Sequence, residues 1–91
     1  SEYDSNQPLK LTGTIETSGY EHPHGFVKLK TADKTWLAVL APPSRMAARG
    51  LPREALRTGI EATVEGFQSR NDPGELRAER IIINGQTIEL R

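Results

Sequence analysis

The side chains best suited to chemistry are the only two histidines, which lie two positions apart as His22-Pro23-His24. Imidazole has a pKa near neutrality and ligates transition metals, so two imidazoles that point to one side of an extended segment could bind one ion. A structural zinc ion needs four ligands, whereas Cu(I) accepts fewer, and Met46 and Trp36 are candidates to complete such a site. The predicted metal ligands are therefore His22, His24 and Met46, with copper as the ion. The alternative is a turn stiffened by Pro23.

A second candidate site is aromatic. The alternation of residues places Phe26 and Trp36 on the polar face of two neighbouring strands, with His24 and Lys28. Aromatic side chains beside cations on an exposed barrel face can stack on bases or sugars. His24, Phe26 and Trp36 are therefore the predicted ligand-binding residues. The alternative is that Trp36 packs in the core, as a single tryptophan of a small barrel usually does.

One segment carries an arginine at every fourth position: Arg45, Arg49, Arg53 and Arg57. On one continuous helix this spacing would form a cationic edge for phosphate or anionic lipid. Gly50 and Pro52 interrupt the segment, and both residues are unfavourable inside a helix. We therefore expect a solvated edge rather than a single cationic face.

The sequence contains no recognisable catalytic motif. It lacks cysteine, a Gly-x-Ser-x-Gly turn and the glycine patterns of nucleotide-binding loops. Twelve Lys and Arg residues balance twelve Asp and Glu residues, so no overall field attracts polyanions and nucleic-acid binding is disfavoured. The longest apolar run, residues 36–41, is too short to span a bilayer. We expect a protein that binds rather than catalyses, with no cofactor other than the candidate copper ion.

Alternating apolar and polar residues predict strands over residues 9–16, 25–31, 35–40, 60–66, 76–83 and 87–90. The short link after the second strand predicts a hairpin with the third. Asn84-Gly85 favours a type I′ turn before the last strand. Residues 44–57 predict a short, interrupted helix, with Ser44 as its N-cap and Gly50 as the end of its first part.

A short helix between strands three and four is the arrangement of the OB-fold, a five-stranded Greek-key barrel, here with one added strand. An SH3-like barrel is the alternative. We expect a mainly β chain, with a flexible lead-in at residues 1–8 and a single domain at residues 9–91. Leu51 and Leu56 should cap one end of the barrel. The predicted barrel core consists of aliphatic residues: Val27, Leu29, Leu37, Val39, Ile60, Val64 and either Ile81 or Ile82.

Three segments resemble a small exported proteobacterial family of unknown function: Leu11-Thr12-Gly13-Thr14-Ile15, His22-Pro23-His24 and Trp36-Leu37-Ala38-Val39-Leu40. The resemblance continues through residues 50–59 and 77–87. That family has an Asn-Pro-His motif, and here His22 stands in place of the asparagine. The resemblance implies a periplasmic location and an OB-like barrel, and it supplies no activity.

The sequence therefore favours a monomeric periplasmic module that recognises a small ligand or a protein partner through residues 22–26 and Trp36. One alternative is a Cu(I)- or Ag(I)-binding chaperone, similar in residue types to the periplasmic chaperones of metal-efflux systems. A second, disfavoured alternative is an OB-fold that binds single-stranded nucleic acid.

Overall fold

Six β-strands make up most of the chain in the computed structural model, which describes all residues from Ser1 to Arg91. Two short helical segments, α1 (Pro43–Ala48) and the 3-10 helix η1 (Arg53–Leu56), lie between the third and fourth strands, as expected. The strands are β1 (Tyr3–Gly19), β2 (Phe26–Lys30), β3 (Thr35–Val39), β4 (Glu61–Ser69), β5 (Glu75–Ile83) and β6 (Gln86–Glu89). The chain is therefore mainly β, as its alternating sequence predicts.

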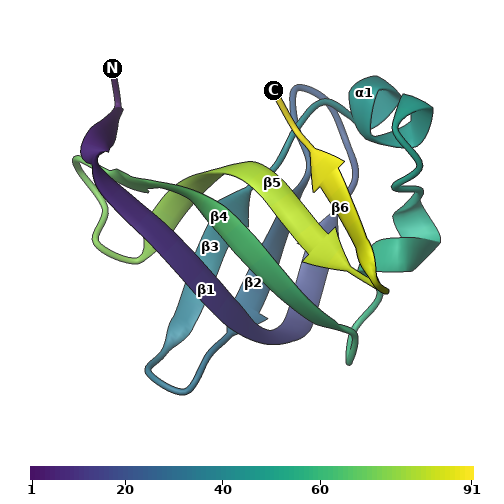
Figure 1. Cartoon of the computed structure of the whole chain (residues 1–91), viewed down its shortest axis with the longest axis horizontal. Helices are drawn as coiled ribbons and strands as arrows, with labels where there is room; N and C mark the ends of the chain where they lie inside the picture. The colour runs from purple at the N-terminus through teal and green to yellow at the C-terminus, as the bar shows by residue number, and fades with distance from the viewer.

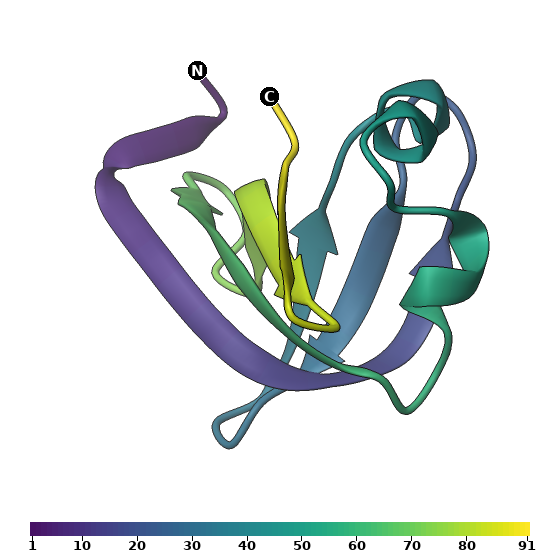
Figure 2. The same ribbon diagram turned by 45° about the vertical axis from the view of Figure 1, so that its right-hand side comes forward.

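The long strand β1 organises the sheet. Its carboxyl-terminal part pairs antiparallel with β2, and its earlier part pairs antiparallel with β4. Figure 2 shows that β1 curves strongly along its length, from the part that pairs with β4 to the part that pairs with β2. The strand order is β3-β2-β1-β4-β5-β6, and β3 also pairs in parallel with β5. The pairings thus run from β1 through β2, β3, β5 and β4 back to β1, with β6 added beside β5 (Figure 1).

Two predicted hairpins are confirmed. Strands β2 and β3 pair antiparallel from Phe26 opposite Val39 to Lys30 opposite Thr35. The turn between β5 and β6 places both Asn84 and Gly85 at positive φ, 52° and 75°. A type I′ turn requires positive φ at both central residues, which is why the Asn-Gly pair indicated it.

Most of the lead-in predicted for residues 1–8 belongs to a strand in the structure, because β1 begins at Tyr3. Tyr3 pairs with Ser69 on β4, and its hydroxyl donates a hydrogen bond to Glu75 Oε2 at 2.5 Å. The Arg70 side chain forms an ion pair with Asp4 at 3.5 Å. These side-chain contacts are made by polar groups. The sequence of this segment therefore lacks the alternation of apolar and polar residues from which a strand is predicted.

The core contains eighteen buried apolar residues, drawn from all six strands and both helical segments. Leu51 and Leu56 are buried as predicted, and the buried residues of the two helical segments are Met46 in α1 and Leu56 in η1. Of the predicted strand positions, four are buried: Val27, Leu29, Val64 and Ile81.

The other predicted core positions, Leu37, Val39 and Ile60, are only half-buried. In β3 the inward residues are instead Trp36 and Ala38, which lie opposite Leu29 and Val27 of β2. Every residue from position 36 to 40 is apolar, so the sequence does not show which alternate set faces inward. The prediction chose the wrong set.

Helix α1 begins without a side-chain cap, so the prediction of Ser44 as N-cap is also wrong. Pro42 is the N-cap and Pro43 the first helical residue, a position at which a proline loses no hydrogen bond. After the helix, Gly50 adopts a φ of 89°, the left-handed conformation that ends many helices. The chain then forms η1 rather than continuing the α-helix.

Candidate functional site

The two histidines lie in the loop between β1 and β2, and both are exposed. The chain bends at His22 and Pro23, so the extended segment on which a shared ion depended is not present. The peptide bond between these two residues is cis. A backbone hydrogen bond from Gly25 N to Ala41 O at 2.8 Å ties the end of this loop to the segment that follows β3.

The third predicted metal ligand, Met46, is fully buried in the core. It lies behind Gly25, where an added Cβ would come within 2.6 Å of the Met46 methyl carbon. The structure therefore places His22 and His24 on the surface and Met46 beneath it. No group of three or more His, Cys, Asp or Glu side chains is arranged to hold a metal ion.

Trp36 is the predicted site residue whose observed position differs most clearly from the predicted one. Its side chain faces the core and is only 7% exposed, so its predicted position on the outer face beside Phe26 is wrong. The Lys34 ammonium lies 4.5 Å from the centre of the indole ring and donates a hydrogen bond to Pro73 O at 3.2 Å. Trp36 thus packs in the core beneath the contact between the β2–β3 and β4–β5 loops.

Three half-buried apolar side chains occupy the outer side of β2 and β3, and we call them the outer patch: Phe26, Leu37 and Val39. Phe26 lies directly opposite Val39, and Leu37 lies opposite Lys28. Residues opposite each other in an antiparallel pair have their Cβ atoms about 5 Å apart and on the same face. The patch is therefore continuous across the two strands.

A missing side chain on β1 positions the aromatic ring of the outer patch. Gly19 is the cross-strand partner of Phe26, and a Cβ built on Gly19 would lie 2.2 Å from Phe26 Cε1. Only a glycine leaves room for the ring to lie against the β1 backbone. Leu37 and Val39 were missed as site residues, and the glycine opposite Phe26 was the feature that could have indicated an outward-facing ring.

Cationic side chains border the outer patch. Lys28 and Lys30 alternate with the inward residues of β2, and Arg77 of β5 lies beside Val39. All three are exposed, and none forms an ion pair. His24 precedes the patch by two residues in the tethered loop. The arrangement offers a partner an apolar contact together with positive charge.

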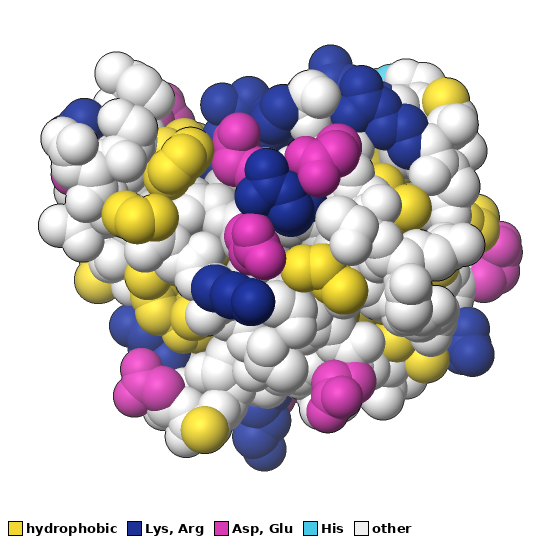
Figure 3. Space-filling view, in the orientation of Figure 1, with side chains coloured by type: hydrophobic (Ala, Val, Ile, Leu, Met, Phe, Trp, Pro, Cys, Tyr) yellow, Lys and Arg dark blue, Asp and Glu magenta, His cyan; other side chains and the backbone are white.

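The surface in the view of Figure 3 is different, because the charges near its centre are paired with one another. Lys10 lies 3.9 Å from Glu65, Glu65 lies 3.0 Å from Arg80, and Arg80 lies 3.0 Å from Glu89. The hydrogen bonds to Glu89 and Glu65 raise the pKa of Arg80 above its ordinary value. This chain of charges links β1, β4, β5 and β6.

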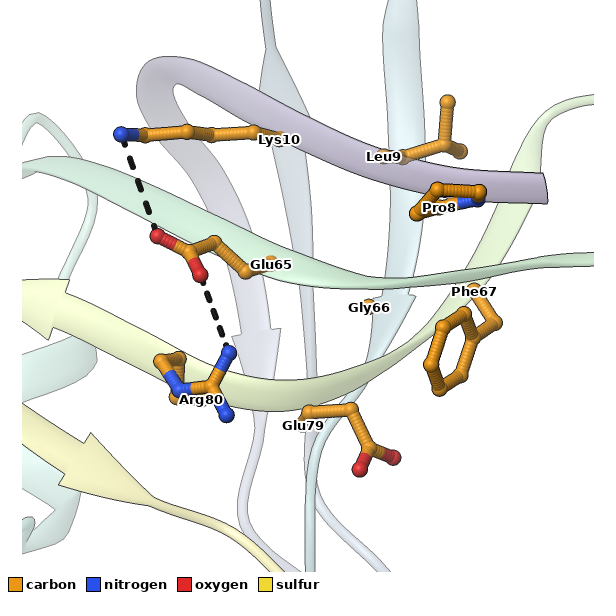
Figure 4. Close-up of a pocket in the computed structure, with 8 residues that line it drawn as sticks. All are labelled: Pro8, Leu9, Lys10, Glu65, Gly66, Phe67, Glu79 and Arg80. Carbon is orange, nitrogen blue, oxygen red and sulfur yellow. Dashed lines mark hydrogen bonds and ion pairs between the residues drawn. The ribbon is translucent and has the colours of Figure 1, made fainter. Parts of the chain in front are cut away.

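A hollow of about 390 Å³ adjoins this chain of charges, between β1, β4 and β5 (Figure 4). Its apolar lining consists of Pro8, Leu9 and Phe67, and Glu79 lies on its opposite side. Glu79 is unpaired in the β4–β5 register, since Glu65 pairs with Arg80 and Gly66 with Ala78. Such a bulge redirects a side chain, and the Glu79 carboxylate lies 3.7 Å from Arg91 Nε.

The fold and its surfaces define a small, mainly β domain with an apolar patch on the outside of one hairpin. No helix is long and apolar enough to cross a membrane. The model of a "Family of unknown function (DUF6152)" matches residues 1–76, and the chain belongs to this family. No curated protein matches the sequence.

Solved structures of TiaS, a tRNA agmatidine synthetase, contain a similar fold. The apo structure matches with a TM-score of 0.65 and 20% identity, over 91% of this chain and 19% of that chain. The complex of TiaS with its tRNA and ATP matches with a TM-score of 0.63 and 22% identity, over 98% and 20%. The ZRD-deleted mutant with agmatine matches with a TM-score of 0.65 and 21% identity, over 96% and 27%. This chain spans only 19–27% of those proteins, and the likeness is one of fold.

Proposed function

We propose that the chain is a non-catalytic binding module of the OB type, which recognises a protein partner through the outer patch and the neighbouring histidine loop. The order of strand pairings supports the OB interpretation, because β3 joins β5 in parallel and a helix lies between β3 and β4. An OB-fold commonly binds its ligands on this side of its second and third strands.

The observation that carries the proposal is the outer patch itself. Phe26, Leu37 and Val39 remain partly exposed although most other large apolar side chains are buried. None of the three residues of the outer patch lines a hollow of the molecule. A flat apolar centre with a polar rim is typical of protein–protein interfaces, whereas small ligands usually occupy concave sites.

The rim indicates the chemistry of the partner. Lys28 and Arg77 have no carboxylate partner, and they lie opposite Leu37 and beside Val39. A partner segment with an apolar side chain next to an acidic one would satisfy both parts of this surface. The ligand-binding set thus becomes His24, Phe26, Leu37 and Val39, with Trp36 as the support beneath it.

The periplasmic location belongs to the same proposal and rests on the resemblance to the exported family. Cell fractionation of the full-length gene product in its native host tests it. Release with the periplasmic fraction is expected, and retention with the cytoplasmic fraction would contradict it.

A photo-reactive amino acid placed at position 37 tests the interface in the native cell. Thr63 is a matched control, because it is also half-buried and its hydroxyl pairs with Thr12 on another part of the surface. We expect one defined cross-linked partner from position 37 and none from position 63. The absence of an adduct at position 37, or the same adduct at both positions, would overturn the proposal.

A further inference from the structure

The four regularly spaced arginines separate into two pairs with different tasks. Arg45 Nη1 donates to Leu90 O at 2.9 Å, and Arg49 Nη1 donates to Glu89 O at 2.7 Å. This pair binds the chain after β5 to helix α1. Arg53 and Arg57 instead lie at and just beyond the two ends of η1, on a different surface.

Arg53 and Arg57 line a groove of about 560 Å³ between the end of β1 and η1. All six lining residues are polar or charged: Thr17, Ser18, Arg53, Glu54, Arg57 and Thr58. The walls are fixed to each other by backbone hydrogen bonds, from Gly59 N to Ile15 O at 2.8 Å and from Ile15 N to Ile60 O at 2.9 Å. The groove is therefore formed by two segments that backbone hydrogen bonds hold together.

Both guanidinium groups are held in place and keep most of their donors free. Arg53 lies 5.2 Å from the centre of the Tyr20 ring, and the Tyr20 hydroxyl is anchored to Leu51 O at 2.6 Å. Arg57 Nη1 donates to Glu54 O at 2.9 Å. Neither arginine forms an ion pair with a carboxylate. Such pre-positioned cations lose little conformational entropy on binding an anion.

We propose that this groove binds a phosphate or sulfate monoester group, a ligand distinct from the protein partner of the outer patch. Guanidinium groups bind such oxyanions through paired hydrogen bonds. The Ser18 hydroxyl forms no hydrogen bond within the protein and is free to donate, whereas the Thr58 hydroxyl already donates to Glu16 O at 2.9 Å. The volume of the groove leaves room for an organic group attached to the anion.

Two carboxylates near the groove have different effects on its charge. The Glu16 side chain accepts a hydrogen bond from Thr35 Oγ1 at 3.4 Å, so it is directed toward β3. Glu54 lines the groove and partly offsets the two arginines. Removing the Glu54 charge should strengthen anion binding, which a purely structural role for the arginines would not predict.

The test is a titration of the purified chain with inorganic phosphate and with glycerol 3-phosphate, followed by NMR of the backbone amides. We expect saturable shifts at Thr17, Ser18 and Thr58. The double variant Arg53→Gln/Arg57→Gln should weaken binding at least about tenfold, since it removes two charge-assisted contacts, and Glu54→Gln should tighten it about threefold.

A charge-matched control removes two cations elsewhere, Lys10→Gln/Arg70→Gln, and should change the affinity by less than about twofold, because neither side chain lines the groove and salt screens exposed charges that are far apart. Vesicles of phosphatidylcholine with and without phosphatidic acid distinguish a lipid headgroup from a soluble ester. Saturable binding of either probe that depends on Arg53 and Arg57 supports the site. No saturable binding of any probe, or an equal loss in the control, would overturn it.

Discussion

Phe26 and Gly19 form the residue pair on which the outer patch depends, because the aromatic ring occupies the space that a side chain on β1 would fill. Gly19→Ala should therefore displace the ring without unfolding the chain, since the obstructing atoms belong to a side chain that can rotate. We expect the Phe26 aromatic resonances to shift strongly while the core methyl resonances stay in place. Unchanged Phe26 resonances in the variant would show that the ring does not lie against Gly19.

Met46 tests the difference between a packing role and a metal-binding role. Because its side chain is fully buried, Met46→Ala should lower the free energy of unfolding by about 2–5 kcal/mol, whereas Met46→Leu should cost less than about 1.5 kcal/mol. Urea unfolding measures both values. A leucine variant as unstable as the alanine variant would contradict the packing role.

Tyr3 gives the protein a predictable response to alkali. Burial, together with the hydrogen bond to Glu75, raises the pKa of Tyr3 from 10.0 to about 12. The unfolded chain loses this proton at a lower pH than the folded chain does, so the contribution of Tyr3 to stability is complete below pH 10 and falls as the pH approaches 12.

Replacing Tyr3 with phenylalanine removes this contribution, so the free energy of unfolding should fall less steeply over that pH range in Tyr3→Phe. Burial also raises the pKa of Tyr20, so part of the alkaline decline will remain in the variant. Chemical unfolding at a series of pH values measures both slopes. Identical slopes for the two proteins would refute the assignment to Tyr3.

At the scale of the elements, the strand positions were largely predictable because each strand except the start of β1 carries an alternating or continuous apolar pattern. The β2–β3 hairpin and the Asn84-Gly85 turn follow from local turn chemistry. The start of β1 could not be predicted, because its contacts are polar and connect Tyr3 with Ser69 and Glu75, 66 and 72 positions away. Local patterns carry no information about such distant partners.

The bulged β4–β5 pair contains a position where the backbone allows no side chain. A Cβ on Gly66 would lie 2.0 Å from Arg77 O, a backbone atom that cannot rotate away. Gly66→Ala should therefore lower the free energy of unfolding by about 1–3 kcal/mol or more, as overpacking does. Gly74→Ala is the control, because its nearest neighbour would be 3.6 Å away in ordinary contact. Equal thermal stability of the two variants would contradict this close approach.

The candidate site was only partly predictable, and the reason lies in β3. The exposed loop position of His24 and the outward direction of Phe26 could be predicted, but the choice between Trp36 and the pair Leu37 and Val39 needed the register with β2. Since both alternate sets of β3 residues are apolar, only the pairing of Trp36 with Leu29 decides which set faces inward. That pairing is a contact between two strands, and the residue pattern within β3 does not reveal it.

Over the whole molecule, the balanced charge conceals an uneven distribution. The cations in Figure 4 are paired with carboxylates, whereas Lys28, Lys30, Arg53, Arg57 and Arg77 have no carboxylate partner. These five cations lie at the outer patch and at the η1 groove, the two surfaces for which we propose ligands. Net charge alone therefore underestimates the capacity of this chain to bind acidic groups.

The most direct test of the central claim is the affinity of the cross-linked partner, once identified, for the purified chain and two charge-introducing variants. Val39→Glu places a carboxylate in the outer patch, and Thr63→Glu places one at the matched control position. We expect Val39→Glu to weaken binding at least about tenfold, because a charge must then be desolvated at the interface, and Thr63→Glu to change it less than about twofold. Equal affinities for the two variants would contradict the assignment of the binding surface to β2 and β3.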